Sequence, residues 1–175
     1  MPTVATSLPQ IAASFLSQDG ETLAVLSAHR PVLLLFLRHF GCTFCREAVC
    51  ELEKLRPQIE SLGTRLVFVH LSNDERARKF FKPHRFDDLP RFADPDGRLY
   101  ESFGLSRAKW RQYLNPRTIA RMFGAWANGN TLGAPDGDVE RMPGVFLLHH
   151  GEIVKSFRHK LVSDRPDYLS LASLE

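Results

Sequence analysis

Residues 32–55 read VLLLFLRHFGCTFCREAVCELEKL, in which an apolar run leads into a Cys-x-x-Cys pair and then into a segment of mixed polarity. Residues 32–37 are apolar at every position, which is typical of a strand covered on both faces. Over residues 43–62 apolar side chains recur at helical spacing, with charged side chains between them. The sequence therefore predicts that Cys42 and Cys45 lie where a buried strand passes into a helix.

Further along the chain, β-rich runs alternate with helical ones. We expect strands over 65–72, 89–93, 144–149 and 153–157, and helices over 11–16, 73–83, 99–103 and near the C-terminal end. Residues 1–9 should be loose, Pro57 should kink or interrupt the long helix, and Asp164 should cap the terminal helix.

This order of elements predicts an α/β fold. Strands separated by helices pair in parallel, whereas two strands joined by the His150-Gly151 turn form an antiparallel hairpin. We expect residues 1–175 to form a single thioredoxin-like domain with a central mixed sheet flanked by helices, a closing β-hairpin and a C-terminal helix.

Composition excludes several classes of protein. The 175-residue chain is 43% hydrophobic with a formal net charge of +3, and its basic residues are scattered among acidic ones, which gives no case for nucleic-acid binding. We find no apolar run of about 20 residues and no secretory signal, so we expect no membrane association. All three cysteines fall within residues 42–50, which favours a local site in a reducing, cytoplasmic setting over a secreted disulfide scaffold.

The spacing of Cys42 and Cys45 suits redox chemistry. Residues three apart on a helix face the same side, and one helical turn gives the Cα separation of roughly 4.4–6.8 Å that a disulfide needs. Unpaired N–H groups at a helix N-terminus stabilise a thiolate, so a thiol there has a pKa below about 8.5. We expect Cys42 at or just before the first turn, and Cys45 one turn later and more buried.

Three other interpretations of the pair were weighed against redox chemistry. A structural zinc site usually has four ligands, and an iron–sulfur cluster usually needs four thiolates, whereas only Cys50 and scattered histidines remain to supply them. The third is an inert pair of small core residues. We favour the redox pair and predict no metal.

Residues beside the pair are candidates for stabilising a thiolate or a bound peroxide: Arg38, Thr43 and Phe44. A guanidinium at position 38 can form charge-assisted hydrogen bonds to either species, or it can pair with a carboxylate at the end of the strand. The thiol of Cys50 projects about 140° around the helix from Cys45, which suits a spectator better than an accessory thiol.

Pro143 immediately precedes the strand expected at 144–149. Thioredoxin-like folds carry a cis-proline at the matching strand start, packed against the cysteine pair. We therefore take Pro143 as a cis-proline candidate, with an ordinary trans turn residue as the alternative.

Three segments together carry a family resemblance: FLRHFGCTFCRE (36–47), ADPDGRLYESFGL (93–105) and GVFLLHHGEIVKSFRHKLVSDRPDYL (144–169). Over about residues 28–171 the chain resembles the peroxiredoxin-like AhpC/TSA antioxidant-enzyme family, which is related to the selenoprotein L and prostamide/prostaglandin F synthase groups. The resemblance implies a thioredoxin fold, a helical insert at about 105–137, and a thiol that acts on peroxides or protein disulfides.

The resemblance leaves the nucleophile open. Typical peroxiredoxins have Thr-x-x-Cys here, so Cys45 matches their peroxidatic cysteine, whereas in thioredoxins the first cysteine attacks, which is Cys42. The proline that opens the peroxiredoxin active-site loop is absent before Cys42, and Pro143-Gly144 stands where many members have Gly-Gly. These departures lean towards thioredoxin-like exchange.

We therefore expect an oxidoreductase that reduces peroxides through a Cys42/Cys45 dithiol–disulfide cycle. It needs no bound cofactor, and a thioredoxin- or glutathione-type donor reduces the disulfide. The alternatives are a general protein disulfide oxidoreductase and a non-catalytic redox-sensing or binding module. The sequence leaves both a monomer and a homodimer open.

Overall fold

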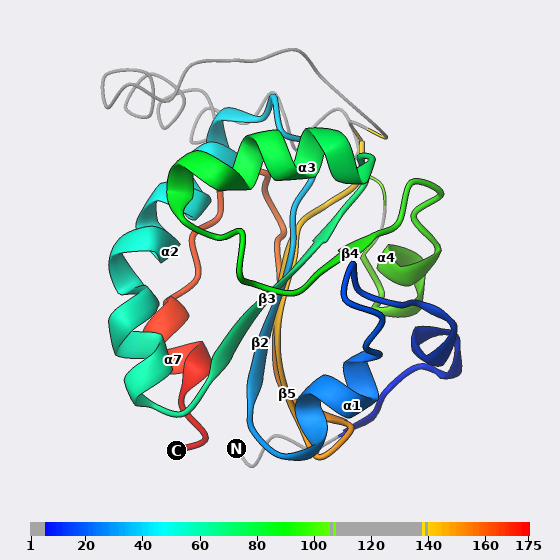
Figure 1. Ribbon diagram of the computed structural model, residues 1–175, viewed down its shortest axis with the longest axis vertical. Coiled ribbons are helices and arrows are strands. Elements are labelled where there is room, and N and C mark those ends of the chain that lie inside the picture. The colour runs from blue at the N-terminus through cyan, green and yellow to red at the C-terminus, as the bar shows by residue number, and fades with distance from the viewer. Residues whose placement is uncertain (1–5, 106, 108–137, 139) are drawn as a thin grey trace.

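The computed structural model describes residues 6–105, 107, 138 and 140–175, and within them a six-stranded mixed sheet forms the centre of the molecule (Figure 1). The strands are β1 (Thr6–Ser7), β2 (Val32–Phe36), β3 (Arg65–His70), β4 (Arg91–Ala93), β5 (Gly144–His149) and β6 (Glu152–Arg158). Their order across the sheet is β1-β6-β5-β2-β3-β4. Strands β2, β3 and β4 pair in parallel, whereas β5, β6 and β1 pair antiparallel. The predicted mixed sheet with a closing hairpin is confirmed.

Helices cover both faces of this sheet. They are α1 (Leu23–Ala28), α2 (Thr43–Ser61), α3 (Asp74–Phe81), α4 (Arg98–Ser102) and α7 (Tyr168–Ala172), with 3-10 turns η1 (Gln10–Ser14) and η2 (Lys82–His84). Figure 1 shows α2 and α7 on one side of the sheet and α1 and α4 on the other. None of the helices among the described residues combines the length and apolar character that crossing a membrane requires.

Strand β2 is apolar throughout because each of its faces meets a different core. Leu33 and Leu35 pack into the cluster formed with α2, α3 and α7, whereas Leu34 and Phe36 pack into the cluster formed with α1 and α4. All β2 residues are at most 2% exposed. Alternate side chains of a strand point to opposite faces, so an unbroken apolar run is what a central strand between two helical layers requires.

The end of β2 is fixed by hydrogen bonds just before the cysteine motif. The Leu37 N–H donates to the Val69 carbonyl at 3.0 Å. The buried Tyr100 hydroxyl from α4 donates to the carbonyls of both Leu37 and Val69. These contacts set the point at which the chain leaves the sheet, and hence where helix α2 begins.

Most predicted elements are confirmed within a residue or two. The helix predicted over 43–62 is α2, and the strands predicted at 65–72, 89–93, 144–149 and 153–157 are β3, β4, β5 and β6. Pro57 was expected to kink or interrupt this helix; α2 continues through it to Ser61, so the helix is not interrupted. Leu52 and Ile59, on either side of the proline, are fully buried, and this burial outweighs the backbone hydrogen bond that proline removes.

Two expectations about the ends of the chain are wrong, and one helix was not expected. Residues Thr6–Ser7 are not loose, because they pair with β6 as an edge strand. Helix α1 was not predicted, since six residues are too few to show a period. The terminal helix begins at Tyr168 and is capped by Asp167, whereas Asp164 accepts hydrogen bonds from the main-chain N–H groups of Lys160 and Leu161. The predicted insert at about 105–137 lies almost entirely outside the described residues.

Candidate active site

Cys42 and Cys45 lie at the N-terminus of α2, beyond the carboxyl end of β2. Cys42 is the N-cap residue, with extended backbone at φ −75° and ψ 122°. Its N–H donates to the His39 carbonyl at 3.0 Å, and its carbonyl accepts the Arg46 N–H at 3.1 Å. A tight turn after the strand therefore delivers Cys42 to the first position of the helix, as the sequence predicted.

The two thiols are in contact and buried. Both cysteines are 4% exposed, so the expectation that Cys45 is the more buried one is wrong. The three cysteines are free thiols in this structure, and the Cys45 thiol donates a hydrogen bond to the Cys42 sulfur. Sulfurs close enough for this hydrogen bond are placed to exchange it for a covalent disulfide on oxidation.

Arg38 contacts both sulfurs from the end of β2. Its Nη1 lies 3.3 Å from Cys42 Sγ, and its main-chain N–H donates to Cys45 Sγ at 3.3 Å. Its Nε donates to the Arg141 carbonyl at 3.1 Å, and the side chain is buried. The structure thus places Arg38 at both sulfurs, where the predicted thiolate-stabilising role requires it.

This arrangement separates the acidities of the two thiols. The hydrogen bond from Cys45 and the positive charge of Arg38 hold the pKa of Cys42 well below its ordinary value, although burial opposes them. The same hydrogen bond, together with burial, raises the pKa of Cys45 well above its ordinary value. The first proton lost from the pair therefore comes from Cys42, which leaves a thiolate beside a neutral thiol.

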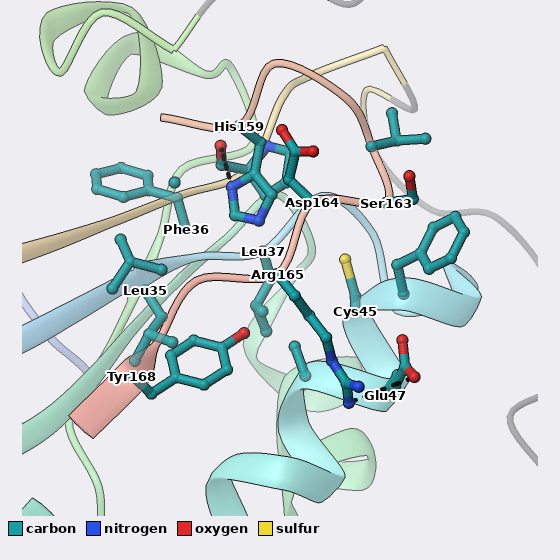
Figure 2. Close-up of a pocket in the computed structure, with 16 residues that line it drawn as sticks. Leu35, Phe36, Leu37, Cys45, Glu47, His159, Ser163, Asp164, Arg165 and Tyr168 are labelled. Atoms are coloured by element: carbon teal, nitrogen blue, oxygen red, sulfur yellow. Dashed lines mark hydrogen bonds and ion pairs between the residues drawn. The ribbon is translucent and has the colours of Figure 1, made fainter. Parts of the chain in front are cut away.

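A small cavity adjoins Cys45 (Figure 2). Its volume of about 30 Å³ has room for one or two water-sized molecules. Burial lowers the pKa of His159 on its wall to about 4 and raises the pKa of Tyr168, so both side chains are neutral near pH 7. Arg165, which also lines the cavity, pairs with Glu51 at 2.9 Å and with Glu47 at 3.4 Å. The carboxylates of Glu47 and Asp164 line the cavity as well, and its size suits only a small molecule.

The other predicted residues lie in different parts of the site. Phe44 forms part of the cavity wall. Thr43 is buried, and its hydroxyl has no hydrogen-bond partner within the described part of the chain. Cys50 is half-buried and lines a separate polar cleft with Glu53 and Lys54. Burial raises the pKa of Cys50, in keeping with the spectator role favoured from its position on the helix.

The cis-proline prediction is wrong. Pro143 does line the Cys45 cavity, but no peptide bond among the described residues is cis. The Pro143 carbonyl accepts hydrogen bonds from the His159 N–H at 3.4 Å and from His159 Nδ1 at 3.1 Å. Trans is the preferred isomer even before proline, and strand β5 begins at Gly144 without requiring the other isomer.

Sequence reasoning missed three residues that shape the site: Arg141, His159 and Tyr168. Arg141 lies 103 residues from Arg38, and the other two come from the segment after β6. No local pattern in the sequence marks them, because Arg141 reaches the site through its main-chain carbonyl, and only the packing of the C-terminal segment brings His159 and Tyr168 to the cavity beside Cys45. Within the described ranges, no cluster of three or more histidine, cysteine or acidic residues is arranged to hold a metal.

The chain is similar to a known family and to individual members of related families. A profile described as AhpC/TSA antioxidant enzyme matches residues 51–160, more than half of the chain. The prostamide/prostaglandin F synthase of Salmo salar is 34% identical over 93 residues, covering 52% of this chain and 46% of the relative. The peroxiredoxin-like 2A of Bos taurus is 29% identical over 147 residues, covering 79% of this chain and 63% of the relative. The chain thus spans less than two thirds of these relatives.

Solved structures share the fold at low sequence identity. Peroxiredoxin Q of Xanthomonas campestris superposes with a TM-score of 0.64 at 17% identity, covering 94% of this chain and 90% of the other. Peroxidoxin BcpB of Mycobacterium tuberculosis gives a TM-score of 0.62 at 18% identity, covering 90% and 89%. The matched family profile begins after Cys50, so the roles of Cys42 and Cys45 depend on the geometry described above.

Proposed function

The chain belongs to the AhpC/TSA antioxidant enzyme family, and we propose that it is an oxidoreductase that reduces peroxides with the Cys42/Cys45 dithiol. One observation carries the proposal. A cysteine at the N-cap of α2 is 3.3 Å from a buried guanidinium and accepts a hydrogen bond from a second thiol. That arrangement supplies both an ionised nucleophile and the group that resolves its oxidised form.

In the first step the Cys42 thiolate attacks one oxygen of the peroxide. The O–O bond breaks, Cys42 becomes a sulfenic acid, and the departing oxygen takes a proton from solvent to leave as water or an alcohol. The Arg38 guanidinium, 3.3 Å from the sulfur, offsets the negative charge that passes from sulfur to oxygen.

In the second step the Cys45 thiol condenses with the sulfenic acid. An S–S bond forms, and the hydroxyl of the sulfenic acid leaves with the Cys45 proton as water. The peroxide has then gained the two electrons that the dithiol has lost. An external dithiol of the thioredoxin type restores the pair by exchange, and no bound cofactor takes part.

One observation favours Cys45 over Cys42 as the nucleophile, and a second observation opposes it. The small cavity is lined by Cys45 and does not include Cys42 among its lining residues. A peroxide of the size of hydrogen peroxide, bound in that cavity, would meet Cys45 first. The raised pKa of Cys45 argues against it as the attacking group, because the neutral thiol is the weaker nucleophile.

A second function is general disulfide exchange. The more acidic cysteine is the first of the pair and caps the helix, which is the arrangement that attacks disulfides in thioredoxin-like proteins. Both functions use the same thiols, so they differ in substrate and not in machinery.

Turnover separates these functions. Hydrogen peroxide consumption is measured with thioredoxin, thioredoxin reductase and NADPH, and disulfide reduction is measured with insulin. We expect peroxide turnover in the unaltered protein and in Cys50→Ser, and its loss in Cys42→Ser. Insulin reduction without peroxide turnover would favour exchange, and the absence of both would leave a redox-sensing module. Either activity surviving in a Cys42→Ser/Cys45→Ser double variant would exclude this dithiol as its source.

A further inference from the structure

A second buried arginine lies next to the thiol site. The Arg141 side chain, in the segment before β5, is 4% exposed. Its Nη2 donates a hydrogen bond to Glu101 Oε1 at 2.6 Å, and its Nε forms an ion pair at 3.2 Å with Asp138 Oδ2, which also accepts a hydrogen bond from Arg107 Nε at 2.9 Å. A buried guanidinium needs such partners to compensate for its lost hydration. Two carboxylates from separate parts of the chain thus anchor Arg141.

The main chain of Arg141 connects this ion-pair cluster to the thiols. Its carbonyl accepts a hydrogen bond from Arg38 Nε at 3.1 Å, while Arg38 Nη1 is 3.3 Å from Cys42 Sγ. The guanidinium is planar and rigid. A hydrogen bond that fixes Nε therefore also fixes the direction in which Nη1 points.

The surrounding chain leaves space for the Arg141 guanidinium. Gly97, just before α4, has φ +70°, and a Cβ atom there would be 2.7 Å from Arg141 Nε. The Arg141 N–H also donates to the Asp138 carbonyl at 3.3 Å. The side chain and the main chain of Arg141 are therefore both held in place beside the start of α4.

We propose that Arg141, clamped by Glu101 and Asp138, is a positioning residue that holds the Arg38 guanidinium against Cys42 Sγ. The proposal deepens the proposed function, because it names the residues that set the state of the same thiol. It assigns Glu101 and Asp138 a role in the site although neither contacts a sulfur.

The physical consequence follows from burial. Removing one carboxylate leaves the Arg141 charge under-compensated, so the segment shifts to find other partners. A displacement of about 1 Å at the Arg141 carbonyl takes Arg38 Nε beyond hydrogen-bonding distance. Arg38 then loses its fixed direction, and the Cys42 thiolate loses part of its stabilisation.

The test measures the pKa of Cys42 in Asp138→Asn and Glu101→Gln, which remove charge and keep size. The rate of iodoacetamide alkylation is followed against pH in a Cys50→Ser background. Trypsin releases residues 39–46, and fragmentation of this peptide separates Cys42 from Cys45. We expect the pKa of Cys42 to rise by about 0.5 to 1, with alkylation at a pH below that pKa slowed about 3- to 10-fold. Asp88→Asn, which removes the Arg56 ion pair away from the site, is the matched control and should change neither value.

A second background distinguishes positioning from general loss of structure. In Arg38→Met, where trypsin no longer cuts after position 38 and Cys42 is followed in a longer peptide that ends at Arg46, the same Asp138→Asn change should no longer move the pKa of Cys42. An unchanged Cys42 pKa in both folded charge variants, or an equal rise in the absence of Arg38, would overturn the proposal. If Asp138→Asn does not fold, the Glu101→Gln variant alone tests the proposal. The Glu101 side chain is 66% exposed, so its replacement should leave the protein folded. The readout needs no peroxide turnover, so its failure is distinct from failure of the proposed function.

Discussion

Replacing Arg38 with methionine tests how the Cys42 thiolate is stabilised. An opposite charge within about 4–6 Å typically lowers the pKa of an acidic group by 1–3, and Arg38 Nη1 lies 3.3 Å from Cys42 Sγ. The larger contribution, the hydrogen bond from Cys45, survives the substitution. We therefore expect the pKa of Cys42 to rise by about 1 to 2.

The kinetic effect follows from the lost thiolate. At a pH below the pKa of Cys42, a rise of this size lowers the thiolate fraction about 10- to 100-fold, and the second-order rate constant with hydrogen peroxide measured there should fall by a similar factor. The rate constant of Arg38→Lys should lie between those of the wild-type protein and Arg38→Met. An ammonium keeps the positive charge but cannot contact both the Arg141 carbonyl and Cys42 as one planar guanidinium does.

Two measurements check this prediction. The pH dependence of Cys42 alkylation gives its pKa, and stopped-flow fluorescence with hydrogen peroxide gives the rate constant. Circular dichroism confirms that each variant is folded. A folded Arg38→Met protein with an unchanged Cys42 pKa would refute the reasoning, because it would show that the Arg38 guanidinium does not stabilise the Cys42 thiolate.

Three further predictions concern stability. Burial lowers the pKa of His159 from 6.5 to about 4, so the unfolded chain binds more protons between these values; the associated stability, up to about 3 kcal/mol, is present above pH 6.5 and lost as the pH falls to 4. Urea titrations of wild type and His159→Gln at several pH values should show a smaller acid loss in the variant, and parallel curves would contradict this. Tyr100→Phe removes the hydroxyl donor of the Leu37 and Val69 carbonyls, of which Val69 keeps the Leu37 N–H, and should lower the free energy of unfolding by about 1–3 kcal/mol in urea denaturation; an unchanged midpoint would show that these contacts contribute nothing. Gly97→Ala places a Cβ 2.7 Å from Arg141 Nε at φ +70° and should lower stability by about 1–3 kcal/mol, visible as a lower thermal midpoint, whereas a neutral effect would mean that the guanidinium moves freely.

Long periodic or fully apolar segments were predictable because the pattern of apolar residues in their sequence shows which positions are buried. Strand β2 needs apolar side chains on both faces, and helix α2 alternates buried and solvated positions over 19 residues. The short elements near the N-terminus could not be predicted in this way. Helix α1 has six residues and edge strand β1 has two, and neither is long enough for a period to appear. Helix α4 is equally short and was predicted because the Asp94-Pro95-Asp96-Gly97 turn precedes it.

The site divides in the same way. Cys42, Cys45 and Arg38 lie within eight consecutive residues, and their chemistry depends on a local junction of strand and helix that sequence spacing reveals. Arg141 meets Arg38 through a carbonyl, a group that every residue carries, so no side-chain pattern could mark it. The trans bond before Pro143 follows the general preference of proline for the trans isomer, which the analogy with thioredoxin-like folds set aside.

Treating the Cys45→Ser variant with one equivalent of hydrogen peroxide and then with dimedone tests the central claim most directly. We predict that mass spectrometry of peptide 39–46 finds the dimedone adduct on Cys42, and that the unaltered protein, treated in the same way without dimedone, yields this peptide two hydrogens lighter, with its two cysteines joined. An unmodified Cys42, with oxidation appearing instead at Cys45 in Cys42→Ser or at Cys50, would contradict the assignment of Cys42 as the nucleophile.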